Sequence, residues 1–155
     1  MLLQITITSW NVRGISSPAK RTKILNHLYK IKSNICFLQE THLTEGESQK
    51  LTAKWINQAY HSVYNSKKRG TSILISKNIP FSHISTLADP EGCYTIVTGS
   101  IGKDTMTLAN IYALSKFPNS CVILGGDFNI TLDSHMDRSS STSTNKSNRK
   151  RLQGT

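Results

Sequence analysis

The sequence predicts a domain of the α/β class, and two observations on the order of its elements support this. Residues 3–9, 18–31 and 35–39 form in turn an alternating apolar and polar run, an amphipathic stretch and a continuous apolar run. These patterns predict a strand, a helix and a strand. From about residue 61 onward, short runs with strand-like patterns alternate with turn-forming residues. A βαβ-like opening followed by a series of strands is typical of an α/β fold.

The first helix has clear start signals. Ser17 is a suitable N-cap, and Pro18 suits the first helical turn because its missing N–H has no helical partner there. The predicted helix covers residues 18–31. Its apolar face consists of Ile24, Leu25, Leu28 and Ile31.

A second helix is predicted over residues 45–57, where Leu51 and Trp55 lie four positions apart on one face. The rest of the chain predicts strands separated by turns rich in Gly, Asp and Lys. The predicted strands are residues 61–65, 70–76, 83–88, 94–101, 105–112 and 121–124.

Charge gives the first indication of function. The chain has 19 Lys and Arg against 9 Asp and Glu, a net charge of +10. Such a surplus favours polyanionic partners, although a solvated, soluble surface explains it equally well. We predict two parts, a domain over residues 1–137 and a basic Ser/Thr-rich tail over residues 138–155. The tail has the composition of a disordered segment that binds nucleic acid without sequence preference.

The cysteines argue against a zinc site. Cys36, Cys93 and Cys121 are odd in number and far apart, so they are predicted to be buried and reduced. Reduced cysteines point to an intracellular protein of the nucleus or cytoplasm. The sequence shows no signal peptide and no apolar stretch long enough to cross a membrane, so no membrane partner is expected.

Polar residues follow three of the predicted strands. Asn11 follows the first strand, Glu40 the second, and Asp127 and Asn129 the last. Residues just beyond strand ends converge on one rim of a layered sheet, where sites are usually built. Carboxylate and amide oxygens are ligands that Mg²⁺ accepts. Taken singly, each of these residues is also an ordinary turn former or a solvated acid.

Four short motifs occur in order along the chain. They are WNVRG at 10–14, LQETH at 38–42, NIYA at 110–113 and GGDFN at 125–129. Together they resemble the endonuclease/exonuclease/phosphatase superfamily. Their sequences are most similar to those of the N-terminal endonuclease domain of LINE-type (non-LTR) retrotransposon ORF2 proteins. The segment RGTSILIS at 69–76 and the pair Asp137-Arg138 also look like that group, so the resemblance covers about residues 3–140.

The resemblance implies a four-layer α/β sandwich of the DNase I-like and exonuclease III-like kind. It also implies a DNA-nicking phosphodiesterase that leaves a 3′-hydroxyl and a 5′-phosphate. Glu40 would be the principal Mg²⁺ ligand with Asn11 beside it, and Mn²⁺ is an expected substitute. DNA is the implied partner, and no small-molecule cofactor is expected.

The same resemblance implies roles for four further residues. Tyr112 would donate a hydrogen bond to the scissile phosphate, and Asp127 would orient or deprotonate the attacking water. Asn129 would hold the phosphate. His42 would have a lesser, positioning role at the rim.

Two departures from the family pattern affect this interpretation. The chain lacks the late Ser-Asp-His motif, because the triplet at residues 133–135 has the wrong order and lies too close to Asn129. Leu114 replaces a proline, and the link at residues 115–120 is too short for the usual crossover helix. We therefore expect a sandwich that is incomplete at its C-terminal end, exposes a sheet edge and apolar surface, and carries a displaced or differently paired last strand.

Three functional hypotheses remain open from the sequence. The first is a Mg²⁺-dependent DNA-nicking endonuclease. The second is a catalytically dead retroelement remnant that at most binds nucleic acid by charge. The third is a hydrolase of small phosphoesters, such as an inositol phosphate phosphatase or a sphingomyelinase, which the net charge of +10 and the motif wording disfavour.

Overall fold

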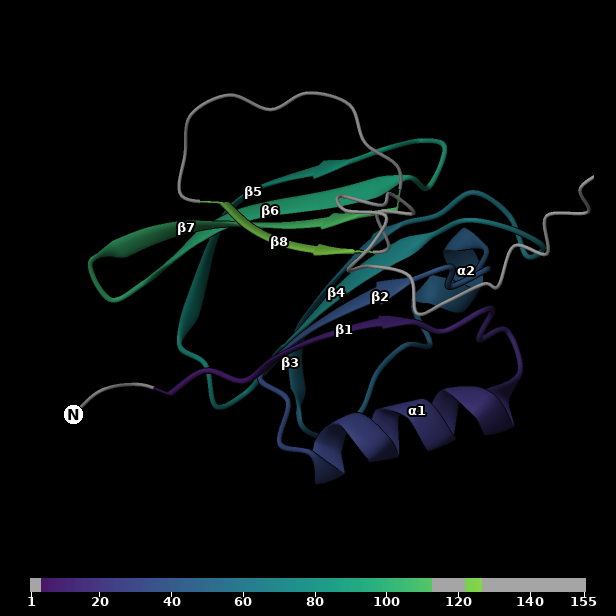
Figure 1. Cartoon of the computed structure of the whole chain (residues 1–155), viewed down its shortest axis with the longest axis horizontal. Helices are drawn as coiled ribbons and strands as arrows, with labels where there is room; N and C mark the ends of the chain where they lie inside the picture. Colours follow the sequence, from purple (N-terminus) through teal and green to yellow (C-terminus); the bar gives the residue numbers. More distant parts are fainter. Residues whose placement is uncertain (1–3, 113–121, 127–155) are drawn as a thin grey trace, which may run out of the picture.

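Two four-stranded sheets pack face to face in the computed structural model, which describes residues 4–112 and 122–126 (Figure 1). The strand orders are β1-β2-β4-β3 and β5-β6-β7-β8. The elements are β1 (Ile7–Asn11), α1 (Pro18–Lys30), β2 (Ile35–Gln39), α2 (Glu45–Ser48), β3 (Ile56–Ser62), β4 (Thr71–Ser76), β5 (Phe81–Ala88), β6 (Tyr94–Ile101), β7 (Asp104–Ile111) and β8 (Val122–Gly126).

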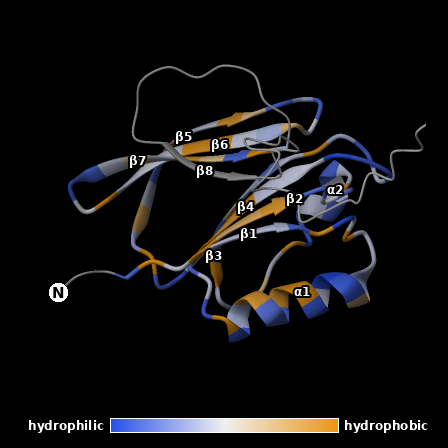
Figure 2. Cartoon of the chain, viewed as in Figure 1, coloured by the Kyte–Doolittle hydropathy of each residue, from blue (hydrophilic) through white to orange (hydrophobic). Residues whose placement is uncertain are grey.

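Helix α1 covers the outer face of the first sheet (Figure 1). Its apolar side is buried and its other side carries lysines, so the helix shows two differently coloured faces in Figure 2. The buried residues of α1 join one core cluster with the outward-facing residues of the sheet, including Cys36, Leu38 and Leu74. Burying such a stripe is what stabilises a helix of this length, since propensity alone is marginal. The predicted helix and its proline start are confirmed, with Ser17 at the N-cap position.

The layer between the sheets is arranged in rows across four strands. The registers pair Gln39 with Thr71 in the first sheet and Thr95 with Asn110 in the second, and these four buried residues form the polar row. Next along the strands comes the apolar row, in which the register pairs Phe37 with Ile73 and Val97 with Leu108. Because strand residues two apart share a face, the sequence itself sets this change from polar to apolar.

The α/β sandwich class is confirmed, and the described residues supply three of its layers: α1 and the two sheets. Strand β5 is an edge strand of the second sheet, on the side away from β8, so it does not test the edge expected from the missing C-terminal strands. On β5, the side chains of Ile84 and Leu87 are 59% and 54% exposed. An apolar edge strand of this kind is open to pairing with another chain.

The prediction of a helix over residues 45–57 is wrong. Only Glu45–Ser48 is helical, started by a capping box between Thr44 and Glu47, and β3 already begins at Ile56. Leu51 and Trp55 do contribute to the core beside α1, but without a helix between them. Pairing of β3 with β4 fixes the chain as a strand, and this tertiary contact overrides the local four-residue spacing. The strand expected at residues 61–65 accordingly lies earlier, at Ile56–Ser62.

Strand β8 pairs in parallel with β7, with Thr107 opposite Val122 and Ile111 opposite Gly126. The short link therefore does not prevent a parallel pairing between these strands. Residues 113–121 of the link, with Leu114 and Cys121, lie outside the described residues, as does the predicted tail at 138–155.

Candidate active site

Four strands end on one edge of the sandwich, which we call the rim. In the first sheet Asn11 at the end of β1 lies opposite Gln39 at the end of β2, and in the second sheet Ile111 lies opposite Gly126. The two sets of strand ends face each other, because β8 contacts both β1 and β2 across the interface. The sandwich therefore brings the first, second and third motifs, and the start of the fourth, to the same edge.

Backbone strain is concentrated at the rim. Among the described residues, five non-glycine residues have positive φ, and four of them lie here: Arg13 (47°), Glu40 (52°), His42 (52°) and Arg69 (61°). This left-handed region costs a residue with a side chain roughly 1 kcal/mol or more, so it persists only where the surroundings enforce it. Such strain gathers at functional sites more than elsewhere in proteins.

Backbone hydrogen bonds enforce this geometry from both sides. The segment that follows β1 donates from Gly14 N to Glu40 O at 2.7 Å. On the other side, Thr41 N donates to Gly70 O at 3.1 Å and His42 N donates to Arg69 O at 2.9 Å. Residues 40–42 are therefore held between two neighbouring segments, and the direction of the Glu40 side chain is fixed by the fold.

Glu40 and His42 lie side by side. His42 Nε2 is 3.9 Å from Glu40 Oε2, and the two side chains are 22% and 23% exposed. Gly14 makes room for the histidine, because a Cβ added at Gly14 would lie 2.8 Å from His42 Nδ1. The φ of Gly14 is +78°, a conformation that side chains disfavour. His42 is therefore packed into the rim beside Glu40.

Asn11 is the last residue of β1, is partly buried, and lies opposite Gln39, the residue before Glu40. Its Oδ1 accepts a hydrogen bond from Arg13 N at 3.1 Å, which orients the amide at the rim. A carboxylate from Glu40 and an amide oxygen from Asn11 are the donors that Mg²⁺ takes, and Mg²⁺ commonly keeps several waters beside one or two protein ligands. Within residues 4–112 and 122–126, no group of three or more His, Cys, Asp or Glu side chains forms a metal cluster. By its chemistry, this oxygen donor set is of the kind that hydrated Mg²⁺ accepts, and it lacks the Cys and His ligands of structural zinc sites.

Tyr112 follows β7 at the rim, where its N–H donates to Cys93 O at 2.7 Å. This places the third motif on the second sheet, opposite the strand end that carries Glu40. Asp127 and Asn129 lie outside the described residues, and the described part of the fourth motif ends at Gly126 on the rim.

The residues that sequence reasoning missed lie directly beneath the rim, in the polar row. Gln39 Nε2 donates to Asn110 Oδ1 at 2.8 Å, and Asn110 Nδ2 donates to Leu38 O at 2.9 Å and Ser72 O at 2.8 Å. This network joins the two sheets one residue before Glu40 and two residues before Tyr112. A signal was present, since both amides interrupt apolar strands inside the quoted motifs.

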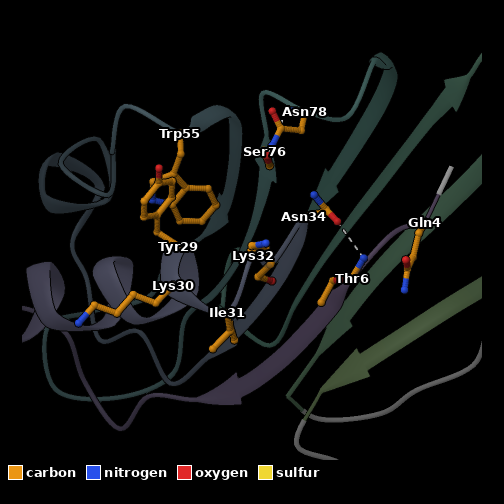
Figure 3. Close-up of a pocket in the computed structure, with 11 residues that line it drawn as sticks. Gln4, Thr6, Tyr29, Lys30, Ile31, Lys32, Asn34, Trp55, Ser76 and Asn78 are labelled. Carbon is orange, nitrogen blue, oxygen red and sulfur yellow. Dashed lines mark hydrogen bonds between the residues drawn. The ribbon is translucent and has the colours of Figure 1, made fainter.

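A pocket of about 730 Å³ lies at the opposite end of the first sheet, between the end of α1 and the start of β2 (Figure 3). Its lining includes Tyr29, Lys30, Lys32, Asn34 and Trp55. Of the predicted site residues that the structure describes, Asn11, Glu40, His42 and Tyr112, none lines it. The candidate active site is therefore the strained rim, and this pocket is separate from it.

Two of the predicted cysteines fall within the described residues, and both are free. Cys36 is buried, and its burial raises the pKa of the thiol to about 11, so it remains protonated and unreactive at neutral pH. Cys93 is only partly buried. Among the helices described here, none has the length and apolar character needed to cross a membrane.

Comparison with known proteins agrees with this architecture. Residues 8–152 match the model of the Endonuclease/Exonuclease/phosphatase family, which is most of the chain. The chain belongs to that family. This match confirms the resemblance noted in the four motifs. The link to transposable elements is supported by the TX1 protein and the TRAS1 domain described below.

A curated relative in this family is the "Transposon TX1 uncharacterized 149 kDa protein" of Xenopus laevis, 23% identical over 149 residues. The alignment covers 84% of this chain but only 11% of that protein. Among solved structures, TDP2 from Caenorhabditis elegans matches with a TM-score of 0.51 and 25% identity, over 72% of this chain and 36% of that one.

The endonuclease domain of TRAS1, a telomere-specific non-LTR retrotransposon, has the same fold. It matches with a TM-score of 0.51 and 12% identity, over 80% of this chain and 58% of that domain. The chain thus spans only part of the length of the proteins it matches.

Proposed function

We propose that this chain is a Mg²⁺-dependent endonuclease domain of the retrotransposon type, which nicks one strand of DNA. The observation that supports it most is the rim: Glu40 and His42 stand in strained, braced conformations beside Asn11, at the ends of strands from both sheets. Family membership makes phosphoester hydrolysis the expected chemistry for such a rim.

The choice of DNA rests on relatives and on charge. The TRAS1 domain is a retrotransposon endonuclease, and a Danio rerio TDP2 structure is a complex with a single-strand DNA product. The net charge of +10 favours a polymer with many phosphates, which releases counterions on binding, over a small molecule with one or a few phosphates. These points favour the nuclease over a hydrolase of small phosphoesters.

In this proposal Glu40 and Asn11 would hold the metal, which would supply positive charge to offset the negative charge that develops on the phosphate. Asp127 orients a water and takes its proton as the oxygen attacks phosphorus. The bond from phosphorus to the 3′-oxygen breaks and that oxygen takes up a proton from solvent water, giving a 3′-hydroxyl and a 5′-phosphate. Tyr112 and Asn129 donate hydrogen bonds to the phosphate oxygens, and His42 positions Glu40 by lying against it.

The test is conversion of supercoiled plasmid to open circle by the purified chain, with Mg²⁺ or with a chelator. Glu40→Gln removes the charge of the metal ligand while keeping its shape, so nicking is expected to fall at least about a hundredfold. Glu45→Gln is the matched control, because Glu45 is an exposed acid at the start of α2 and should leave nicking unchanged.

Three outcomes decide between the hypotheses. Mg²⁺-dependent nicking that is lost in Glu40→Gln and kept in Glu45→Gln supports the endonuclease. Equal nicking by all three proteins indicates a contaminating nuclease. A folded chain that binds DNA without nicking it, with a binding strength that falls steeply with salt, is instead the catalytically dead remnant.

A further inference from the structure

A basic turn lies beside the rim, and none of the roles assigned above involves it. It comprises residues 65–69, with the sequence NSKKR, between β3 and β4. Lys67 and Lys68 are exposed on it. Three consecutive cations on a surface loop are usually just a solvated turn. A binding role for them therefore needs support from the structure.

The turn is ordered by its own side chains. Asn65 Oδ1 accepts hydrogen bonds from Lys67 N at 2.9 Å and Lys68 N at 3.0 Å. An antiparallel bridge also pairs Asn65 with Lys68. This is the arrangement by which asparagine stabilises a tight turn, so the two lysines are presented from a defined backbone.

The base of the turn is tied to the candidate active site. His42 N donates to Arg69 O, and Thr41 N donates to Gly70 O, the same two bonds that brace the strained segment at residues 40–42. Gly70 N in turn donates to Gly92 O at 3.0 Å. Lys68 and Lys67 therefore lie one and two residues from Arg69, whose backbone helps to hold residues 40–42.

The charges on the turn are only partly neutralised. Arg69 pairs with Glu91, with Nη1 to Oε2 at 3.1 Å. Within the described part of the chain, neither Lys67 nor Lys68 forms an ion pair. The ring of Tyr64, which is 44% exposed, lies 5.5 Å from Lys68 Nζ and 5.1 Å from Arg69 Cζ. A cation over an exposed aromatic ring gains only about 0.5–1 kcal/mol, so a phosphate readily displaces this contact.

We propose that the basic turn, residues 65–69, is the contact for the DNA backbone next to the cleaved bond, with Lys67 and Lys68 each binding a phosphate. This inference rests on the proposed endonuclease function and adds the place where the strand lies. Phosphate contacts of this kind carry no base specificity. They fix the register of the nucleic acid relative to the site.

The experiment measures binding without cleavage, by fluorescence anisotropy of a labelled DNA duplex with the full-length chain in a metal-free buffer. Lys67→Ala/Lys68→Ala is expected to weaken binding about tenfold. It should also lower the slope of log affinity against log salt by about 2, since each lost phosphate contact removes close to one released counterion. Lys67→Arg/Lys68→Arg should keep both the affinity and the slope.

The matched control removes the same charge at the other end of the first sheet. Lys30 and Lys77 are both exposed there, at the ends of α1 and β4, so Lys30→Ala/Lys77→Ala should stay within about twofold of the parent. Equal weakening by both double variants would mean a general charge effect and would overturn the proposal. Unchanged binding in Lys67→Ala/Lys68→Ala, or no DNA binding at all, would overturn it too.

The nicking assay separates this proposal from the function on which it rests. If Glu40-dependent nicking is present but the turn variants bind normally, the endonuclease stands and the DNA lies elsewhere. If nicking is absent but the lysines of the turn still carry the binding, the turn is a DNA contact on a chain that does not cleave.

Discussion

The two neighbouring rows between the sheets differ in what holds them together. The polar row, next to the rim, joins the sheets through the Gln39–Asn110 hydrogen bond and through Thr71 Oγ1 and Thr95 Oγ1, 2.7 Å apart. The apolar row, deeper in the sandwich, joins them only by packing of large side chains. Packed hydrocarbon tolerates small changes of shape, whereas a buried hydrogen bond holds two groups at one distance and angle.

The difference teaches where this fold needs precision. An apolar row of the same size would hold the sheets together at least as strongly, because buried polar groups add little net stability. The polar row instead fixes the relative position of the strand ends that carry Glu40 and Tyr112. A rim that must place groups within about an ångström benefits from that constraint more than from extra stability.

Replacing Asn110 should have the largest effect. Asn110→Leu keeps the volume but leaves Gln39 Nε2, Leu38 O and Ser72 O without this partner in a buried layer. We expect a loss of about 4 kcal/mol in the free energy of unfolding, measured by urea denaturation. Leu108→Met, a similar change of shape in the apolar row, should cost less than about 1.5 kcal/mol. Equal costs would show that the two rows do not differ as described.

The next largest effect is expected at Gly70, where the rim and the basic turn meet. Its φ is +96°, and an added Cβ would clash with Thr41 Oγ1, a buried hydroxyl with no hydrogen-bond partner. Gly70→Ala should therefore lower the free energy of unfolding by about 3 kcal/mol and reduce nicking, because it displaces the strand end that carries Glu40. Gly46→Ala is the control, since nothing lies near a Cβ added there. A Gly70→Ala chain as stable as its parent would mean that the rim is not braced in this way.

The elements that were predicted well from the sequence are those in which the local hydrophobic pattern agrees with the burial of the same residues in the fold. The capped, amphipathic α1 and the fully buried β2 were placed almost to the residue, because local preference and tertiary packing favour the same structure. The failure at residues 45–57 has the opposite cause. Leu51 and Trp55 have helical spacing, but pairing with β4 decides the conformation from residue 56 onward.

The sequence predicted which residues form the candidate site, and that assignment stays a prediction, but it did not predict the geometry of their backbone. The motifs gave Asn11, Glu40, His42 and Tyr112, and the strand ends bring their backbones to one rim. The left-handed backbone at Glu40 and His42 follows from hydrogen bonds to segments distant in sequence, so no local pattern encodes it. The roles of Asp127 and Asn129 stay predictions.

A partly buried histidine on the outer face of the first sheet should also make stability depend on pH. His61 on β3 contacts Ser72 Oγ through Nδ1 at 2.9 Å, and burial lowers the pKa of its imidazole from 6.5 to about 4. Well above pH 6.5 the ring is neutral in both the folded and the unfolded chain, so its titration does not affect the free energy of unfolding. As the pH falls from 6.5 towards 4, His61 becomes protonated in the unfolded chain while it stays neutral in the folded chain. The free energy of unfolding therefore falls by about 2 kcal/mol.

Urea denaturation between pH 7.5 and 4 measures this effect. His61→Gln should flatten that part of the curve, whereas His83→Gln, at an exposed histidine on β5, should leave it as in the parent. A His61→Gln chain with the parent's full pH dependence would assign the effect to other groups.

The smallest effect, and the most direct test of what the polar row does, is expected from the threonine pair. Thr95→Val alone leaves the buried Thr71 Oγ1 without this partner and should cost about 1 kcal/mol. Thr71→Val should cost less, because Thr95 Oγ1 still donates to Thr71 O at 3.2 Å. The double change replaces both partners by groups of the same shape, so it should cost less than Thr95→Val alone. If the double variant is as stable as the parent yet nicks DNA more slowly, the polar row serves the position of the rim. If the double variant is less stable than the parent but nicks at the parent's rate per folded molecule, the polar row is simply part of the core. The contrast between the two rows would then have no functional meaning.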